Sequence, residues 1–222
     1  PAPSWCARLR AATLVAGPML PRFGAATLPP PGGDVIGRRR VDTHFLALEQ
    51  LGAEVRVGDD YTVEAKALVG TDIFLDEPSV TGTENALMAA VAAKGRTVLR
   101  NAPAEPHVQD LALFLNTLGA QIEGIGSNVY TIEGGRPLTG ARYEIGPDHI
   151  EIGSFIGLAA VTNGDITIEG VRGDDLRATL LGFERLGIRP RLDGHTLYVD
   201  PNQERRVRPD LGGHVPKLED GP

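Results

Sequence analysis

The residues best suited to chemistry lie in one stretch, residues 29–42, which reads PPPGGDVIGRRRVD. Three prolines hold its start extended, and two glycines permit backbone angles that let a ligand come close to the main chain. Asp34 then supplies one carboxyl group, and three consecutive arginines follow at residues 38–40. An acid beside a cationic cluster is suited to binding an anionic substrate and moving a proton. The alternative is an ordinary surface loop, which a Gly-Gly-Asp sequence alone usually indicates.

A repeat in the sequence places this stretch on a regular scaffold. Apolar helices closed by Gly24, Gly95 and Gly164 are each followed by a short strand, and a second helix ends at each Leu-Gly pair, at residues 51, 118 and 186. Further strands are predicted at residues 54–57, 121–123 and 196–199. The period is about 68 residues, so each repeat is a whole subdomain, read as strand, helix, strand, helix, strand, strand. These elements predict an α/β fold in which helices cover one face of a sheet.

The first repeat is irregular at the place where Asp34 lies. From its glycine to its Leu-Gly pair it is about four residues longer than the other two repeats, and the extra length falls in residues 29–42. The counterparts of this loop are residues 101–106 and 170–175. Added loop length on a regular scaffold is where function usually concentrates, so we favour a functional role for the loop.

Two predicted helix starts each have two interpretations. Asp42 either caps the helix that follows it or belongs, with the preceding arginines, to an anion site. Ser79 or Thr81 is expected to cap the helix that ends at Gly95, and free backbone N–H groups at such a start also bind anions. Both roles are compatible at each position, because a helix N-terminus is a favourable place for a diphosphate.

One further cluster, at residues 148–151, combines His149 with Asp148 and Glu151. It is a candidate metal or acid–base group, although a single histidine at this spacing fits no standard metal pattern. After residue 200 the repeat pattern fades. Residues 205–208 are read as one more strand edge, and residues 209–222 as an exposed loop.

The composition excludes several classes of protein. A net charge of -7 argues against nucleic acid as the main partner. The single cysteine excludes an internal disulfide framework and is compatible with a reducing cytoplasm. No apolar run reaches the length of a membrane span, and no signal peptide opens the chain. Because the first residue is proline, we expect the chain to be a fragment.

Several stretches, taken together and in order, resemble the UDP-N-acetylglucosamine enolpyruvyl transferase family. They are residues 22–24 (RFG), 31–42 (PGGDVIGRRRVD), 48–53 (LEQLGA), 79–85 (SVTGTEN) and 147–153 (PDHIEIG). The match runs from about Arg8 to about Asp210. The resemblance implies an inside-out α/β barrel of repeated units, incomplete in this chain. It implies two repeats of one domain in residues 1–146, and the first repeat of a second domain in residues 147–222.

The resemblance also implies a reaction. The 3-hydroxyl of UDP-N-acetylglucosamine attacks phosphoenolpyruvate and phosphate leaves, in the first committed step of peptidoglycan synthesis. No metal and no organic cofactor is implied. The implied setting is the cytoplasm, with no membrane or nucleic acid partner and a monomer at full length. The resemblance thus implies that the chain is one part of an enzyme with two small-molecule substrates, phosphoenolpyruvate and UDP-N-acetylglucosamine.

By position, the resemblance assigns site residues. Asp34 stands where most members have a cysteine that donates the proton, and an acid role needs a protonated carboxyl, whereas adjacent arginines favour the ionised form. Arg10 and Arg39 match arginines at the phosphoenolpyruvate and diphosphate positions. The uridine site is matched by residues 39–43, namely Arg39, Arg40, Val41, Asp42 and Thr43, and the diphosphate segment by Ser79 and Val80. Arg40 replaces a usual proline, and Glu77 replaces a basic residue found in some members.

The family's N-terminal Lys-Asn pair and its catalytic aspartate match no residue of this chain, so the chain alone is expected to be inactive and to expose apolar surface. Two alternatives stay open. One is the sister family that makes 5-enolpyruvylshikimate-3-phosphate, although its Leu-Gly-Asn-Ala-Gly-Thr stretch is absent. The other is a non-catalytic relative that binds sugar nucleotides.

Overall fold

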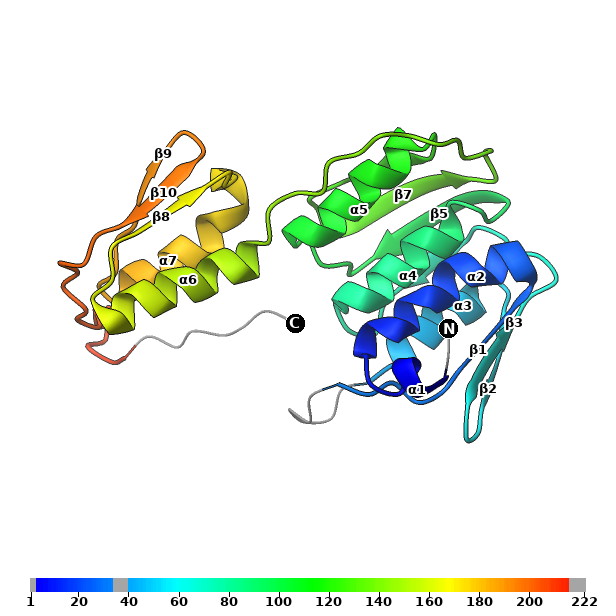
Figure 1. Cartoon of the computed structure of the whole chain (residues 1–222). Helices are drawn as coiled ribbons and strands as arrows, with labels where there is room; N and C mark the ends of the chain where they lie inside the picture. Colours follow the sequence, from blue (N-terminus) through cyan, green and yellow to red (C-terminus); the bar gives the residue numbers. More distant parts are fainter. Residues whose placement is uncertain (1–2, 34–39, 216–222) are drawn as a thin grey trace. The chain divides into compact units, whose positions relative to one another are not determined.

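The computed structural model describes residues 3–33 and 40–215 (Figure 1). The chain divides into two compact units. Glu144 is the last residue of the first unit, and Ile145 begins the second. Each unit has its own hydrophobic core.

The first unit contains two of the three repeats. Its elements are α1 (Pro3–Cys6), the 3-10 helix η1 (Arg10–Val15), α2 (Ala16–Phe23), β1 (Ala25–Leu28), α3 (Asp42–Gln50), β2 (Glu54–Val57), β3 (Tyr61–Glu64), β4 (Asp72–Phe74), α4 (Val80–Ala90), β5 (Gly95–Arg100), α5 (Pro106–Thr117), β6 (Gln121–Glu123) and β7 (Val129–Gly134). One sheet has the order β1-β3-β2 and is antiparallel. The other has the order β4-β5-β7-β6, in which only β4 and β5 are parallel. Helices α2, α4 and α5 lie side by side over these sheets (Figure 1).

The second unit contains one repeat. It consists of α6 (His149–Thr162), β8 (Ile166–Glu169), the 3-10 helix η2 (Gly173–Leu176), α7 (Arg177–Arg185), β9 (Arg191–Asp193) and β10 (Thr196–Val199). The strands form an antiparallel sheet in the order β8-β10-β9. Its core is small, with Ile156, Leu176, Leu197 and Val199 fully buried.

The order helix, strand, helix, strand, strand is confirmed in all three repeats. The predicted leading strand appears, among the described residues, only in the second repeat, as β4. Helix α4 ends at Ala90 and not at Gly95, because a turn follows and Gly95, with a φ of 92°, opens β5. Helix α6 ends at Thr162, and its C-cap Asn163, with a left-handed φ of 56°, takes the closing role predicted for Gly164.

The predicted strand edge at residues 205–208 is wrong. None of these residues is in a strand, and Arg205 has a φ of 50°, which is incompatible with an extended chain. Its side chain instead donates to backbone oxygens, among them that of Pro201, and Arg205 Nη1 lies 3.4 Å from the Ala160 oxygen. Residues 209–215 are all exposed, in agreement with the predicted loop.

A buried amide, that of Asn85 in α4, joins the two repeats of the first unit. Asn85 Nδ2 donates to the Thr13 carbonyl oxygen at 2.8 Å, and Asn85 Oδ1 accepts from the Gly17 N–H at 2.8 Å. A Cβ atom on Gly17 would lie only 2.7 Å from the Asn85 oxygens, so glycine is required for this approach. These bonds attach η1 and α2 to α4.

The third partner of this amide is the buried ring of His44 in α3. Asn85 Nδ2 lies 2.8 Å from His44 Nδ1, and His44 Nε2 lies 3.1 Å from the Thr81 hydroxyl. Because Asn85 Nδ2 can only donate, Nδ1 accepts and the neutral ring carries its proton on Nε2, which donates to Thr81. Burial, together with the positive charge of Arg10, lowers the pKa of His44 to about 4.

We expect the first unit to lose stability in acid through His44. The unfolded histidine has its ordinary pKa of 6.5, and the folded one about 4. Between these values the unfolded chain binds the extra proton, so stability falls as pH falls, by roughly 3 kcal/mol across the window. The variant His44→Gln should be less stable at pH 7.5 but should lose much less on acidification. Urea unfolding followed by the single tryptophan, Trp5, measures this within the first unit.

The matched control is His107→Gln, which changes an exposed histidine of the same unit. It should retain the pH dependence of the parent chain. Equal losses of stability in the parent and in His44→Gln between pH 6.5 and 4 would contradict the assignment.

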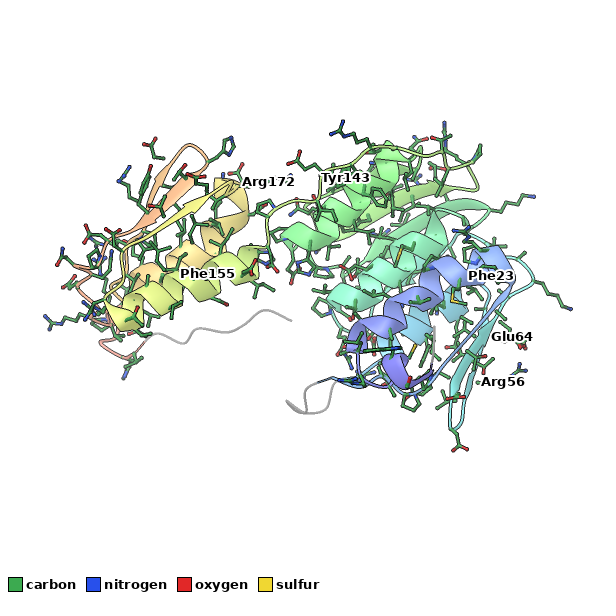
Figure 2. The ribbon with its side chains drawn as sticks, viewed as in Figure 1. Phe23, Arg56, Glu64, Tyr143, Phe155 and Arg172 are labelled. Carbon is green, nitrogen blue, oxygen red and sulfur yellow. The ribbon has the colours of Figure 1, made fainter. Side chains whose placement is uncertain are left out.

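Helix α6 has an uncovered apolar face. Ile150, Phe155, Leu158 and Val161 are exposed, Val161 to 80%, while Ile156 on the opposite side is fully buried. Figure 2 labels Phe155 on this helix. Although α6 is strongly apolar, no helix within the described residues is both long and apolar enough to cross a membrane. This face agrees with the apolar surface expected from the sequence.

We expect the isolated chain to bind an apolar dye at α6. The double variant Leu158→Gln, Val161→Gln should lower the fluorescence of bound 8-anilinonaphthalene-1-sulfonate about twofold, since it removes two of the exposed apolar side chains of this helix. The control, Val57→Gln with Val69→Gln, changes two exposed valines of the first unit and should have little effect. Equal dye binding by both variants would show that α6 is not the site.

Candidate functional site

The structure describes seven of the nine site residues that the sequence suggested. Asp34 and Arg39 lie outside the described residues. Arg10 is the first residue of η1, and the others lie at two helix starts: Arg40, Val41, Asp42 and Thr43 at α3, and Ser79 and Val80 at α4. The geometry below therefore concerns the two ends of the loop and the elements that hold them.

Arg10 lies beside two parts of the long connection between β1 and α3. Its Nη2 atom donates to the Arg40 carbonyl oxygen at 2.6 Å. In the other part, a Cβ atom on Gly33 would lie 3.4 Å from Arg10 Cβ, and one on Gly32 would lie 1.9 Å from the Ala7 oxygen. Gly32 is therefore needed for close contact with the protein's own backbone, a reason that the sequence did not reveal.

Arg40 is surrounded by carboxylates. Its Nε atom lies 2.8 Å from Asp42 Oδ2, its Nη2 atom 2.6 Å from Asp76 Oδ2, and its Nη1 atom 3.9 Å from Glu77 Oε2. The hydrogen bonds to Asp42 and then to Asp76 raise the pKa of Arg40. The guanidinium group thus stays charged and is held between the two helix starts.

The predicted capping role of Asp42 is wrong. The N-cap of α3 is Val41, which has no capping side chain, and Asp42 is the first residue of the helix itself. Its carboxylate instead accepts a hydrogen bond from the guanidinium group of Arg40, two residues earlier in the chain. A negative charge in the first turn still interacts favourably with the helix dipole.

Thr43 connects α3 to the segment before α4. Its side chain is fully buried, and its hydroxyl donates to Asp76 Oδ1 at 2.7 Å. This bond first, and then the Arg40 guanidinium, lowers the pKa of Asp76. No pattern in the sequence points to Asp76, because an acidic residue just before a helix is common and its two partners lie more than thirty residues away.

Ser79 is the N-cap of α4, as one of the two sequence interpretations predicted. Its hydroxyl accepts from the Gly82 N–H at 3.1 Å, while the Thr81 hydroxyl is bonded to His44. A Cβ atom on Gly82 would lie 3.0 Å from Ser79 Oγ and 3.2 Å from Thr43 Cγ2. The N-terminal turns of α3 and α4 are therefore adjacent. Val80 packs its side chain against the core.

This arrangement is suited to binding an anion. Two helix N-termini lie next to each other, each with a partial positive charge, and Arg10 adds a full charge nearby, whereas the charge of Arg40 is paired with the carboxylates of Asp42 and Asp76. His44, directly beneath, is neutral near pH 7, because its pKa is lowered to about 4. The described residues of the site thus offer positive charge and backbone N–H groups. The proton transfer suggested by the sequence depends on Asp34, which lies outside the described residues.

The second candidate cluster of the sequence, around His149, has a structural explanation. Asp148 Oδ1 accepts from the backbone N–H groups of Ile150 and Glu151, so Asp148 is the N-cap of α6. In the described ranges, no group of three or more His, Cys, Asp or Glu side chains gathers closely enough to hold a metal ion. The geometry gives this cluster no role in metal binding.

Comparison with known proteins finds close relatives along the whole chain. It is 60% identical over 220 residues to a "UDP-N-acetylglucosamine 1-carboxyvinyltransferase" of Bradyrhizobium diazoefficiens, covering 99% of this chain and 51% of the relative. It is 55% identical over 215 residues to a protein of the same name from Treponema denticola, covering 97% of this chain and 50% of the relative. The chain therefore spans about half the length of the curated relatives it matches.

Solved structures share the fold. The enolpyruvyl transferase NikO from Streptomyces tendae matches with a TM-score of 0.74 at 19% identity, over 89% of this chain and 48% of that protein. EPSP synthase from Acinetobacter baumannii matches with a TM-score of 0.63 at 19% identity, over 86% of this chain and 46% of that protein. These likenesses confirm the predicted enolpyruvyl transferase fold, with about half of the full-length structures covered.

A family model described as EPSP synthase (3-phosphoshikimate 1-carboxyvinyltransferase) matches residues 1–206. This match covers both compact units, including both helix starts of the candidate site. The chain belongs to the EPSP synthase (3-phosphoshikimate 1-carboxyvinyltransferase) family.

Proposed function

We propose that the protein containing this chain transfers the enolpyruvyl group of phosphoenolpyruvate to the 3-hydroxyl of UDP-N-acetylglucosamine, a step in making peptidoglycan precursors in the cytoplasm. The observation that carries the proposal is the 60% identity, over 99% of the chain, to a relative named for this activity. The relatives are about twice as long as this chain. The activity is therefore proposed for the full-length gene product, and we expect these 222 residues alone to be inactive.

The geometry of the site supports the proposal, because both substrates are anions. Phosphoenolpyruvate carries a carboxylate and a phosphate, and the nucleotide carries a diphosphate. The adjacent starts of α3 and α4, with the guanidinium group of Arg10, offer the positive charge and N–H donors that such groups require, and Arg40 is held beside them by its carboxylate partners. We assign Ser79 and Val80 to the diphosphate and residues 39–43 to the uridine end.

The proposed reaction is an addition followed by an elimination. The sugar hydroxyl oxygen forms a bond to C2 of phosphoenolpyruvate, while Asp34 gives a proton to C3. The C–O bond to phosphate then breaks, C3 gives up a proton that restores the Asp34 carboxyl group, and the double bond re-forms. The proton of the hydroxyl group leaves with the phosphate, so no oxidant, reductant or metal is needed for the balance.

The identity of the acceptor provides the direct test. The full-length gene product should release phosphate from phosphoenolpyruvate when UDP-N-acetylglucosamine is added, and at least about a hundredfold more slowly with 3-phosphoshikimate. The second acceptor is the competing candidate, because the family model and one similar structure carry that enzyme's name. Preference for 3-phosphoshikimate would overturn the proposal, and binding of UDP-N-acetylglucosamine without phosphate release would favour the non-catalytic alternative.

Asp34 provides a second test through the antibiotic fosfomycin, which inactivates the resembled family by alkylating the loop cysteine. A carboxylate is a much weaker nucleophile than a thiolate toward an epoxide, so the protein with Asp34 should keep its activity after incubation with fosfomycin. The variant Asp34→Cys should lose most of its activity under the same conditions. Residual phosphate release after a timed incubation measures both, and rapid loss in the unaltered protein would remove Asp34 from the proposed role.

A further inference from the structure

Asp76 uses its two carboxylate oxygens on two different partners. Oδ1 accepts from the Thr43 hydroxyl at 2.7 Å, and Oδ2 pairs with Arg40 Nη2 at 2.6 Å. Thr43 is fully buried, whereas the Arg40 side chain is 36% exposed. Asp76 therefore joins a buried residue to a partly exposed cation at the surface.

The backbone that carries Asp76 is itself held in place. Leu75, the preceding residue, is fully buried, its N–H donates to the Arg100 oxygen, and its oxygen accepts from Asn101 Nδ2 at 2.9 Å. Three residues after Asp76, Ser79 caps α4. One short, anchored segment thus supports both helix starts of the candidate site.

Without Asp76, Arg40 would keep Asp42 as its near partner. Asp42 lies two residues away on α3, whereas the Glu77 oxygen is 3.9 Å from the guanidinium. The bond to Asp76 is the one that draws the Arg40 side chain from α3 toward the start of α4. The direction of this cation is therefore set by Asp76.

We propose that Asp76 is a positioning residue for the sugar nucleotide, which orients Arg40 and Thr43 in the segment assigned to the uridine end. This inference rests on the proposed function and adds a residue that the sequence comparison did not single out. Thr43 and Arg40, the two hydrogen-bond partners of Asp76 among the described residues, both belong to the segment assigned to the uridine end, so Asp76 should influence binding of the nucleotide rather than the chemical step.

The test compares two ion pairs of the same compact unit. Asp76→Asn removes the charge that holds Arg40. Asp72→Asn is the matched control, because Asp72 forms a two-point pair with Arg100 at 2.9 Å but contacts neither Arg40 nor Thr43. Titration calorimetry with UDP-N-acetylglucosamine should give a Kd about tenfold higher for Asp76→Asn, since a charge-assisted hydrogen bond is lost, and an unchanged Kd for Asp72→Asn.

Kinetics on the full-length gene product separate positioning from chemistry. Asp76→Asn should raise the KM for UDP-N-acetylglucosamine by a similar factor, while kcat and the KM for phosphoenolpyruvate stay within about twofold. Arg40→Gln, at a surface position where misfolding is not expected, should weaken nucleotide binding as well. The double variant should be no weaker than Arg40→Gln, because both changes act through one contact.

Nucleotide binding by Asp76→Asn equal to that of Asp72→Asn would overturn the inference. So would a fall in kcat with unchanged binding, or additive effects in the double variant. A parent protein that binds UDP-N-acetylglucosamine but releases no phosphate would instead overturn the proposed transfer reaction, and the calorimetric comparison would still decide the role of Asp76.

Discussion

The first compact unit depends on the buried amide of Asn85. Its oxygen and nitrogen are bonded to Gly17, Thr13 and His44, which lie on three other helices. A buried amide with an unmade bond costs about 1–3 kcal/mol for each polar group left without a partner, so these helices have little freedom to shift against α4. Gly17 and Asn85 are 68 residues apart, which is the length of the repeat. The contact therefore joins one repeat to the next.

This network is continuous with the candidate site through two neighbouring residues of α3. His44 points to Asn85 and Thr81, and Thr43 points to Asp76. Consecutive residues of a helix point about 100° apart, so one turn of α3 can contact the core of α4 and the segment before it at the same time. Because His44 is buried and neutral, its hydrogen bonds hold α3 against α4 without adding a charge beneath the anion site. The buried network around Asn85 and His44 thus holds in place the helix starts that carry the charged side chains.

The sequence predicted what depends on local patterns. The order of helices and strands, and Ser79 as a cap, follow from periodicity and from residues within one helical turn. Asp42 does not cap α3, because its carboxylate accepts a hydrogen bond from the Arg40 guanidinium. Capping preferences do not take such a competing partner into account. The partners of Asn85 and Asp76 could not be predicted, because they are 33 to 72 residues away in sequence. The assignments of Asp34 and Arg39 remain predictions, outside the described residues.

Equivalent helices of different repeats, α4 and α6, pack against different kinds of surface. Aligning residues 89–91, at the end of α4, with residues 159–161 of α6 places Phe155 at the position of Asn85. In α4 this position meets backbone groups of η1 and α2, which an amide can satisfy. In α6 it carries an aromatic ring that is 44% exposed, in a face with Leu158 and Val161. An apolar residue gains nothing from a polar backbone partner, so the surface that suits α6 is itself apolar. The repeats therefore share the same helices and strands, but the residue at a single position determines which kind of surface each helix packs against.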